Sequence, residues 1–485
     1  MNYLQFLNMI PEAGLVLILI LVFLADLIWP KACHAKCRKC SLLASLTIIL
    51  LVLQTILCAI TGPTEAFSGL YVASSASNLM KSILTLASLI VVVMSQSWVS
   101  HKDNVKREGE FYVLLVATLL GMYVMMSSGH FLLFFLGLEM ASVPLGCMVA
   151  LDKLKKDSAE AAAKFILTAT FSSGVMLYGI SFIYGACGTL YFDDVATQLS
   201  ILGSTPTSLS ILGLVFFFSG LGFKISLVPF HFWTADTYQG APTAVTAYLS
   251  VVSKGAAAFA LLTILLKVFA PMVEYYDYIL YIVIVLSITV ANLMAIRQKE
   301  LKRFMAFSSI SQAGYIMLAA IGTYEAGLAA LIYYVLVYVV ANLAVFAVIN
   351  VVETRGGGST MISQLNGFYK TNPRLTFLMT IALFSLAGIP PFAGMFSKFF
   401  VFMAAAQQGS ALAYTVVFIS LVNTVVSLYY YLLIVKAMYI VNDAKPLPTF
   451  SSDCPTKAAL ALCTVGIALF GLCSWVYNWI AAACL

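Results

Sequence analysis

Five ionisable side chains lie inside stretches that are otherwise apolar enough to cross a membrane. They are Glu139, Lys164, Lys224, Lys254 and Lys398. Inserting one charged residue at the middle of a bilayer costs about 2.5–3.5 kcal/mol, so such residues usually face protein or water and usually have a function. Burial weakens the proton affinity of a lysine, and a neighbouring carboxylate restores it. Several such groups in series are therefore suited to relaying protons across a membrane.

The composition indicates a helical protein that crosses the membrane many times. Of 485 residues, 62% are hydrophobic and 9% are charged, whereas soluble domains carry about 25% charged residues. The net charge of +6 therefore does not indicate nucleic-acid binding. The first apolar run, 11–29, is expected to be retained as a span, because a basic cluster follows it and no basic segment precedes it.

The apolar runs predict an all-α membrane protein with about fourteen transmembrane helices, each near the ~20 residues that cross a bilayer. The connections between them are too short to hold a nucleotide or flavin domain, so no redox cofactor is expected on this chain. The predicted spans are 11–29, 41–61, 77–99, 110–128, 131–151, 160–185, 208–235, 241–268, 272–296, 302–321, 325–352, 374–405, 411–440 and 457–482.

The loops alternate between basic and acidic, which predicts the orientation of the chain. Of 26 Lys and Arg residues, 20 fall in loops after odd-numbered spans, four are the intramembrane lysines, and only Lys81 and Lys267 lie near the other face. Basic loops stay in the cytoplasm. Both termini are therefore expected on the outer, periplasmic side of a bacterial inner membrane.

Prolines predict that two of the spans are broken. Pro229 follows Lys224 in the seventh span, and Pro390 and Pro391 precede Lys398 in the twelfth. A proline inside a helix removes a backbone hydrogen bond, and the freed groups must meet protein or water within a membrane. Breaks five spans apart, each beside a lysine, are typical of inverted repeats around a binding site at mid-membrane.

The predicted division of the chain follows from these breaks. Spans 4–8 form the first five-helix repeat and spans 9–13 the second, inverted one, although the tenth span lacks an acid to match Glu139 in the fifth. The predicted regions are an N-terminal three-helix region at 1–109, the first repeat at 110–270, the second at 271–440, and a C-terminal loop and last helix at 441–485.

One cluster of cysteines has the spacing of a metal site. Cys33, His34, Cys37 and Cys40 follow the first span within a strongly basic loop. Their spacing fits an iron–sulfur cluster or zinc, but the surroundings favour a cytoplasmic loop with reduced thiols. We therefore expect no metal on this chain.

Three long segments, in the expected order, resemble signatures of the antiporter-like membrane subunits of respiratory complex I. The resemblance covers essentially the whole chain. The segments are FKISLVPFHFWTADTYQGAPT at 223–243, KRFMAFSSISQAGY at 302–315 and SLAGIPPFAGMFSK at 385–398. The chain resembles the N-type subunits of this family, because it has a lysine in the twelfth span where M-type subunits have glutamate. L-type subunits continue into a lateral helix, which is not expected here because the sequence ends at Leu485.

The resemblance implies roles for individual residues. Glu139 becomes the acid partner of Lys224, Lys254 the central lysine of the eighth span, and Lys398 the terminal lysine that leads outward. Lys164 matches a lysine of the sixth span. These roles remain open to a purely structural alternative, in which Lys224 and Lys398 only pair with broken-helix carbonyls.

Two further positions have open alternatives, and two depart from the family pattern. Lys164 lies four residues after Glu160, so it also fits a lysine whose amine reaches the membrane interface. His231 fits either the polar axis or a structural role. Ala235 replaces a usual proline, and Gln312 replaces a common histidine, which puts a proton role at position 312 in doubt.

The resemblance implies a proton-translocating subunit of the membrane arm of a NADH:quinone oxidoreductase. FMN, iron–sulfur clusters, NADH and quinone would be bound by partner subunits, and the neighbours would include further antiporter-like subunits and lipid. Two alternatives remain. One is a subunit of a multi-subunit cation/proton antiporter, which shares the motifs, and the other is a membrane-arm scaffold that does not transport.

Overall fold

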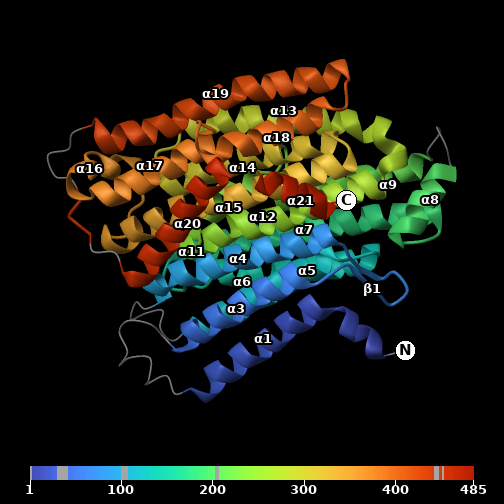
Figure 1. The fold of residues 1–485 in the computed structure, drawn as a ribbon, viewed down its shortest axis with the longest axis horizontal. Helices are drawn as coiled ribbons and strands as arrows, with labels where there is room; N and C mark the ends of the chain where they lie inside the picture. Colours follow the sequence, from blue (N-terminus) through green and yellow to red (C-terminus); the bar gives the residue numbers. More distant parts are fainter. Residues whose placement is uncertain are drawn as a thin grey trace.

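The computed structural model describes residues 3–29, 42–99, 107–201, 207–441, 447–450, 453–473 and 475–484. Within these ranges, thirteen helices are long and apolar enough to cross a membrane. Figure 1 shows the long helices running side by side, from α1 and α3 at one edge of the molecule to α19 at the other. The predicted all-α membrane architecture is confirmed.

The N-terminal half contains helices of mostly 18 to 32 residues and one small β-hairpin. Strands β1 (Thr64–Ala66) and β2 (Tyr71–Ala73) are antiparallel, with Glu65 opposite Val72. The helices are α1 (Ile10–Ile28), α3 (Leu42–Ile60), α4 (Ser75–Val99), α5 (Glu108–Met126), α6 (Phe131–Val149), α7 (Lys156–Cys187), α8 (Phe192–Ile201), α9 (Ser208–Ile225), α10 (Phe232–Gly240), α11 (Thr243–Tyr248) and α12 (Lys254–Lys267).

The C-terminal half continues the bundle. Short 3-10 turns cover Ala270–Met272, Leu318–Ile321 and Ile362–Leu365, and another, Tyr3–Asn8, precedes α1. The helices are α13 (Val273–Ile296), α14 (Leu301–Met317), α15 (Tyr324–Arg355), α16 (Phe368–Thr371), α17 (Pro373–Ala387), α18 (Ala393–Ala406), α19 (Ala411–Tyr439), α20 (Cys454–Leu472) and α21 (Val476–Cys484).

Both predicted breaks are present in the structure. The seventh span consists of α9 and α10, separated at Pro229, and the twelfth consists of α17 and α18, separated at Pro390 and Pro391. Because α17 and α18 are each too short to cross alone, the twelfth predicted span is absent from the thirteen long helices. The break in the twelfth span thus accounts for the difference between fourteen predicted spans and thirteen long helices, since α9 of the seventh span is long enough by itself.

Four local features differ from the expected pattern of spans and loops. The segment between the second and third spans holds the β-hairpin, and helix α8 occupies the segment before the seventh span. The last predicted span, 457–482, is divided into α20 and α21. In the eighth span, Leu249–Ser253 is π-helical and ends directly before Lys254. Single π-helical turns inside helices are frequent at functional sites.

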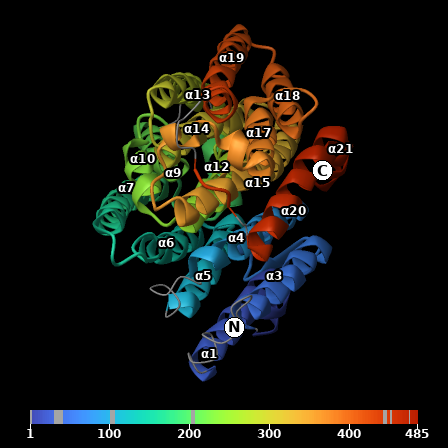
Figure 2. The same cartoon turned by 90° about the vertical axis from the view of Figure 1, so that its left-hand side faces the viewer.

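Two spans that carry polar side chains are enclosed by the rest of the bundle. The most apolar stretches of α14 and α15 are fully buried, and Figure 2, viewed along the helices, places α15 and α12 inside the ring formed by their neighbours. Close packing elsewhere needs glycine: a Cβ on Gly121 of α5 would lie 2.4 Å from the backbone nitrogen of Ala141 of α6. Small residues let membrane helices approach in this way.

Candidate proton-transfer site

Two backbone groups at the break in the seventh span pair with side chains. Ser226 ends α9 in the left-handed conformation, with φ of 69°. The Phe223 carbonyl accepts a hydrogen bond from the Trp233 indole at 3.1 Å, and the Val228 amide donates to Ser287 Oγ at 2.9 Å. The break is thus a defined structure, and it places Lys224 in the last turn of α9, where the helix dipole favours a cation.

Lys224 is buried, with 4% of its surface exposed, and it has a neutral hydrogen-bond partner. Its Nζ donates to Ser142 Oγ at 2.7 Å. Glu139, the predicted acid partner, lies three residues before Ser142 on α6 and is half-buried. Glu139 acts on Lys224 electrostatically, but no ion pair joins these two described residues. The structure therefore places the predicted partners in the same neighbourhood without direct contact.

Lys254 follows the π-helical segment and is also enclosed, with 3% of its surface exposed. Its Nζ donates to Ser309 Oγ of α14 at 2.7 Å and lies 5.3 Å from the centroid of the Tyr238 ring. The Tyr238 hydroxyl is 3.3 Å from the same Ser309 oxygen. A serine, a tyrosine and a lysine from three helices thus form one polar cluster.

Hydroxyl and amide groups continue from this cluster toward the second break. Ser308, adjacent to Ser309, hydrogen-bonds the Tyr431 hydroxyl. Gln312 Nε2 donates to that hydroxyl and to the Leu386 carbonyl, each at 3.2 Å. The Tyr334 hydroxyl donates to Gln312 Oε1. Gln312 therefore joins the polar groups of α14 to the end of α17, without a titratable group of its own.

Lys398 completes the series at the second break. It is 4% exposed, and its Nζ donates to the Ala387 carbonyl, at the end of α17, at 2.9 Å. A cavity with an accessible volume of about 10 Å³ is lined by Lys398, Gln312, Tyr334 and Ser397. About 10–15 Å³ is the smallest such volume that holds one water. A single water there would link Gln312 to Lys398.

His231 lies at the first break, at the start of α10. It is buried, and its Nδ1 has no hydrogen-bond partner in the described structure. Its ring stacks on Phe232 with centroids 4.6 Å apart, and it interacts electrostatically with Lys254. The geometry places His231 beside the series but does not connect it by a hydrogen bond to any of the three buried lysines.

Lys164 occupies a different environment. Its side chain is 44% exposed and forms ion pairs of 2.7 Å with Glu160 and with Asp236, while Arg303 holds the other Asp236 oxygen at 2.7 Å. Both carboxylate oxygens of Asp236 are thus held by cations, one by Lys164 and the other by Arg303. The structure therefore does not bring Lys164 together with the enclosed lysines.

Sequence reasoning missed two other buried lysines. Lys302, counted with the loop residues, is buried, lies 3.4 Å from Glu353 and donates to the Ala241 carbonyl at 3.2 Å. Lys81, assigned to the neighbourhood of the outer face, is completely buried and forms a 2.7 Å ion pair with Glu12. The sequence did contain signals for the second pair: Glu12 and Lys81 each lie close to the start of an apolar helix.

Metal binding has no support in the described part of the chain. No group of three or more His, Cys, Asp and Glu side chains within those ranges is arranged to hold an ion. The cysteines with metal-site spacing, Cys33, Cys37 and Cys40, lie outside the described residues.

Comparisons with known proteins agree over nearly the full length. The sequence model of the NADH:quinone oxidoreductase/Mrp antiporter transmembrane family matches residues 128–427. NADH-quinone oxidoreductase subunit N of Phocaeicola vulgatus is 55% identical over 480 residues, which cover 99% of this chain and 98% of that protein. A chain of respiratory complex I from Thermus thermophilus with bound aureothin is 31% identical with a TM-score of 0.81, covering 97% of this chain and 99% of that one.

A more distant structure shares the fold. A chain of the Mrp complex from Dietzia sp. DQ12-45-1b has a TM-score of 0.81 at 20% identity, covering 100% of this chain and 97% of that one. The fold is thus shared with a chain of respiratory complex I and with a chain of an Mrp complex, and the sequence identity is higher to the complex I chain.

Proposed function

The chain belongs to the NADH:quinone oxidoreductase/Mrp antiporter family, and we propose that, as subunit N of a NADH-quinone oxidoreductase, it moves protons through Lys224, Lys254 and Lys398. One observation supports this most strongly. Each of these amines donates to a hydroxyl or a carbonyl, at 2.7, 2.7 and 2.9 Å respectively. None of the three forms an ion pair within the described residues. Such a lysine can lose its proton without leaving a carboxylate unpaired.

The contrast with the other lysines supports the same assignment. Lys81, Lys164 and Lys302 all contact carboxylates within 4 Å, so each of these amines is one half of an ion pair. The buried lysines with neutral partners are instead sensitive to any approaching or departing charge. Glu139, near Lys224 but not bound to it, is placed to be such a charge.

In the proposed sequence, protons enter from the basic, cytoplasmic side near Lys224 and Lys254 and leave outward near Lys398. The hydroxyl groups of Ser309, Ser308 and Tyr431 and the Gln312 amide lie between the last two lysines. Both termini would then face the outer side. The two breaks lie in the proposed repeats, 110–270 and 271–440, flanked by the regions 1–109 and 441–485.

The driving force would come from partner subunits. In this proposal, those subunits bind NADH, FMN, iron–sulfur clusters and quinone, and a neighbouring antiporter-like subunit passes on a rearrangement of charge. The 55% identity to a NADH-quinone oxidoreductase subunit favours this assignment. The cation/proton antiporter alternative has support from the shared fold at 20% identity.

The test is proton uptake by inverted membrane vesicles after NADH addition, in Lys254→Met and Lys398→Met variants whose complexes are shown to assemble. Lys267→Met is a matched control, because Lys267 is exposed at the end of α12. We expect uptake to be lost in the first two variants and kept in the control. Unchanged uptake in all three would support the scaffold, whereas sodium-driven proton flux without NADH would support the antiporter.

A further inference from the structure

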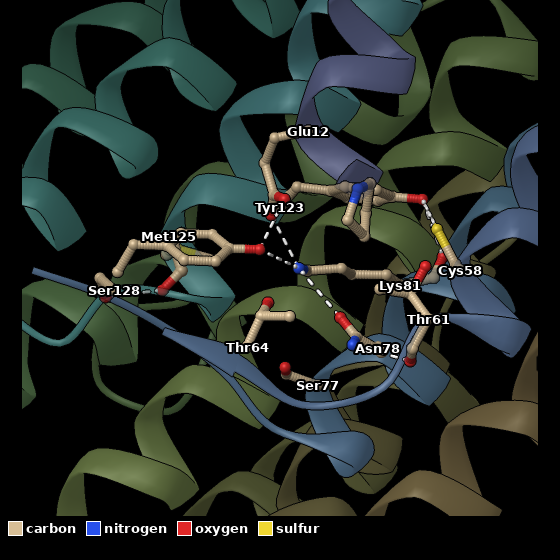
Figure 3. Close-up of polar contacts among 12 residues, drawn as sticks. Glu12, Cys58, Thr61, Thr64, Ser77, Asn78, Lys81, Tyr123, Met125 and Ser128 are labelled. Carbon is tan, nitrogen blue, oxygen red and sulfur yellow. Dashed lines mark hydrogen bonds and ion pairs between the residues drawn. The ribbon is translucent and has the colours of Figure 1, made fainter. Parts of the chain in front are cut away.

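The buried ion pair Glu12–Lys81 shares no hydrogen bond or ion pair with the three lysines of the proposed series, and both residues lie outside the matched residues 128–427. Glu12 comes from the first turn of α1 and Lys81 from the second turn of α4. Their charged atoms are 2.7 Å apart. Figure 3 shows Lys81 lying between Glu12 and Asn78, whose Oδ1 is 3.3 Å from the amine.

Three neighbouring elements, β2, α5 and α3, place titratable groups beside the pair or next to one another. Tyr71 of β2 donates to Glu12 Oε2 at 2.7 Å and lies 3.4 Å from Lys81 Nζ. Tyr123 of α5 has its ring centroid 5.4 Å from the Lys81 amine, and its hydroxyl is 3.1 Å from the Cys58 thiol of α3. Figure 3 shows Cys58 and Tyr123 close together beside Lys81. Burial raises the pKa of Tyr71, so its hydroxyl remains a donor.

The hairpin lies between this cluster and the aqueous face. Strand β2 alternates, with Tyr71 and Ala73 buried and Val72 exposed, as expected when one face of a strand is covered. Glu65, opposite Val72, is exposed. The buried face of the hairpin thus covers the pair, and Tyr71 contacts Glu12 from that face.

A purely mechanical role explains this pair poorly. Burying two charges costs more than their attraction usually returns, and apolar residues of similar size hold helices together equally well or better. In addition, Glu12 Oε1 has no hydrogen-bond donor other than its ion-pair partner. If Lys81 moved away, this oxygen would be buried with no partner, and a carboxylate in that position binds a proton.

We propose that Glu12 and Lys81 form a further proton-binding site, in which the Glu12 carboxylate takes up one proton when the pair opens and releases it when the pair closes. The proton is exchanged with water at the hairpin face. Lys81 keeps its own proton and only gives up its contact with Glu12, so the O–H bond of Glu12 is the only covalent bond that forms or breaks. The inference rests on the proposed proton transport by this chain, and it adds an ion-pair switch, separate from the three lysines with neutral partners, to that function.

The test uses the double variant Glu12→Gln/Lys81→Met in the assembled complex, because it removes both charges and preserves size. Proton uptake per NADH oxidised is measured in inverted vesicles. Ser82→Ala is the matched control, because its hydroxyl only donates to the Thr55 carbonyl between α4 and α3. We expect a reduced ratio in the double variant and an unchanged ratio in the control. An unchanged ratio in the double variant overturns the proposal and leaves the pair as a clamp.

A milder variant covers the case in which the double variant does not assemble. Tyr71→Phe keeps the ion pair and the ring but removes the donor to Glu12, which raises the proton affinity of the carboxylate. We expect the pH profile of proton uptake per NADH to move to higher pH, and an unchanged profile overturns the proposal. Lys224→Ala, measured in parallel, tests the proposed function by itself, since Lys224 has no contact with this cluster.

Discussion

The second helix break, between α17 and α18, leaves no room for a side chain at Gly394, and the variant Gly394→Ala tests this requirement. A Cβ on Gly394 would lie 1.6 Å from the Ser385 carbonyl oxygen and 2.6 Å from its carbon. Real Cβ contacts essentially never fall below 3.0 Å, so the end of α17 must move by at least 3.0 − 1.6 = 1.4 Å. Both atoms belong to the backbone and have no alternative rotamer.

The cost can be worked out from three terms. Overpacking of this kind costs about 1–3 kcal/mol, the strained Gly394 N–H hydrogen bond to Ser385 Oγ about 1 kcal/mol, and alanine in a helix returns about 1 kcal/mol. The net destabilisation is about 1–3 kcal/mol. Because Ala387 lies two residues after Ser385, the hydrogen bond between its carbonyl and Lys398 is disturbed as well, and proton uptake should fall.

The assay is the thermal midpoint for loss of this chain from the purified complex, together with NADH-driven proton uptake. Gly174→Ala is the matched control, because Gly174 is also helical and nothing lies within 4 Å of its added Cβ. We expect a lower midpoint and reduced uptake for Gly394→Ala only. Equal midpoints and equal uptake for the two variants would refute the reasoning about the break.

Three further outcomes are expected. Lys302→Met leaves the Glu353 carboxylate buried and should destabilise the fold by about 3 kcal/mol in a denaturant titration. This is the low end for a broken buried pair, because Lys155 still lies 3.5 Å from Glu353. The double variant Lys302→Met/Glu353→Gln should recover part of the lost stability. Asp236→Asn removes the carboxylate that Lys164 and Arg303 both contact at 2.7 Å, so it should lower the thermal midpoint of the complex, by a small amount because these side chains are partly exposed; an unchanged midpoint would show that the pairs do not stabilise the fold. Lys164→Ala should leave proton uptake per NADH unchanged within about twofold, because this side chain is 44% exposed and already paired, and a loss like that expected for Lys254→Met would contradict its placement outside the series.

Breaks and enclosed charges could be predicted from the sequence because each has a local chemical cause. A proline cannot donate the hydrogen bond that continues a helix, so Pro229 and Pro390 mark their breaks without any tertiary information. A lysine in an apolar run likewise has a cost of insertion into the membrane that can be recognised from the local sequence alone. The apolar runs also gave the other spans, since a membrane helix satisfies its backbone within one segment.

The contacts of the lysines could not be predicted in the same way. Ser142, Ser309 and the Ala387 carbonyl are neutral, and nothing in their local sequence indicates which of many hydroxyls or carbonyls will meet an amine. The Glu12–Lys81 pair joins residues on two different spans, and only packing of α1 against its neighbours brings them together. The assignment of Lys302 to a loop was misleading, because the first turn of α14 is covered by other helices.

The most direct measurement of the central proposal is NADH-driven proton uptake and quinone reduction by inverted vesicles carrying Lys224→Ala, with assembly of the complex verified on the same preparation. Removal of the amine leaves Ser142 without its donor and removes the first charge in the proposed series. We predict that the complex assembles while quinone reduction and proton uptake both collapse. Assembly with both activities at the level of the unaltered protein would contradict the proposal and assign Lys224 a structural role.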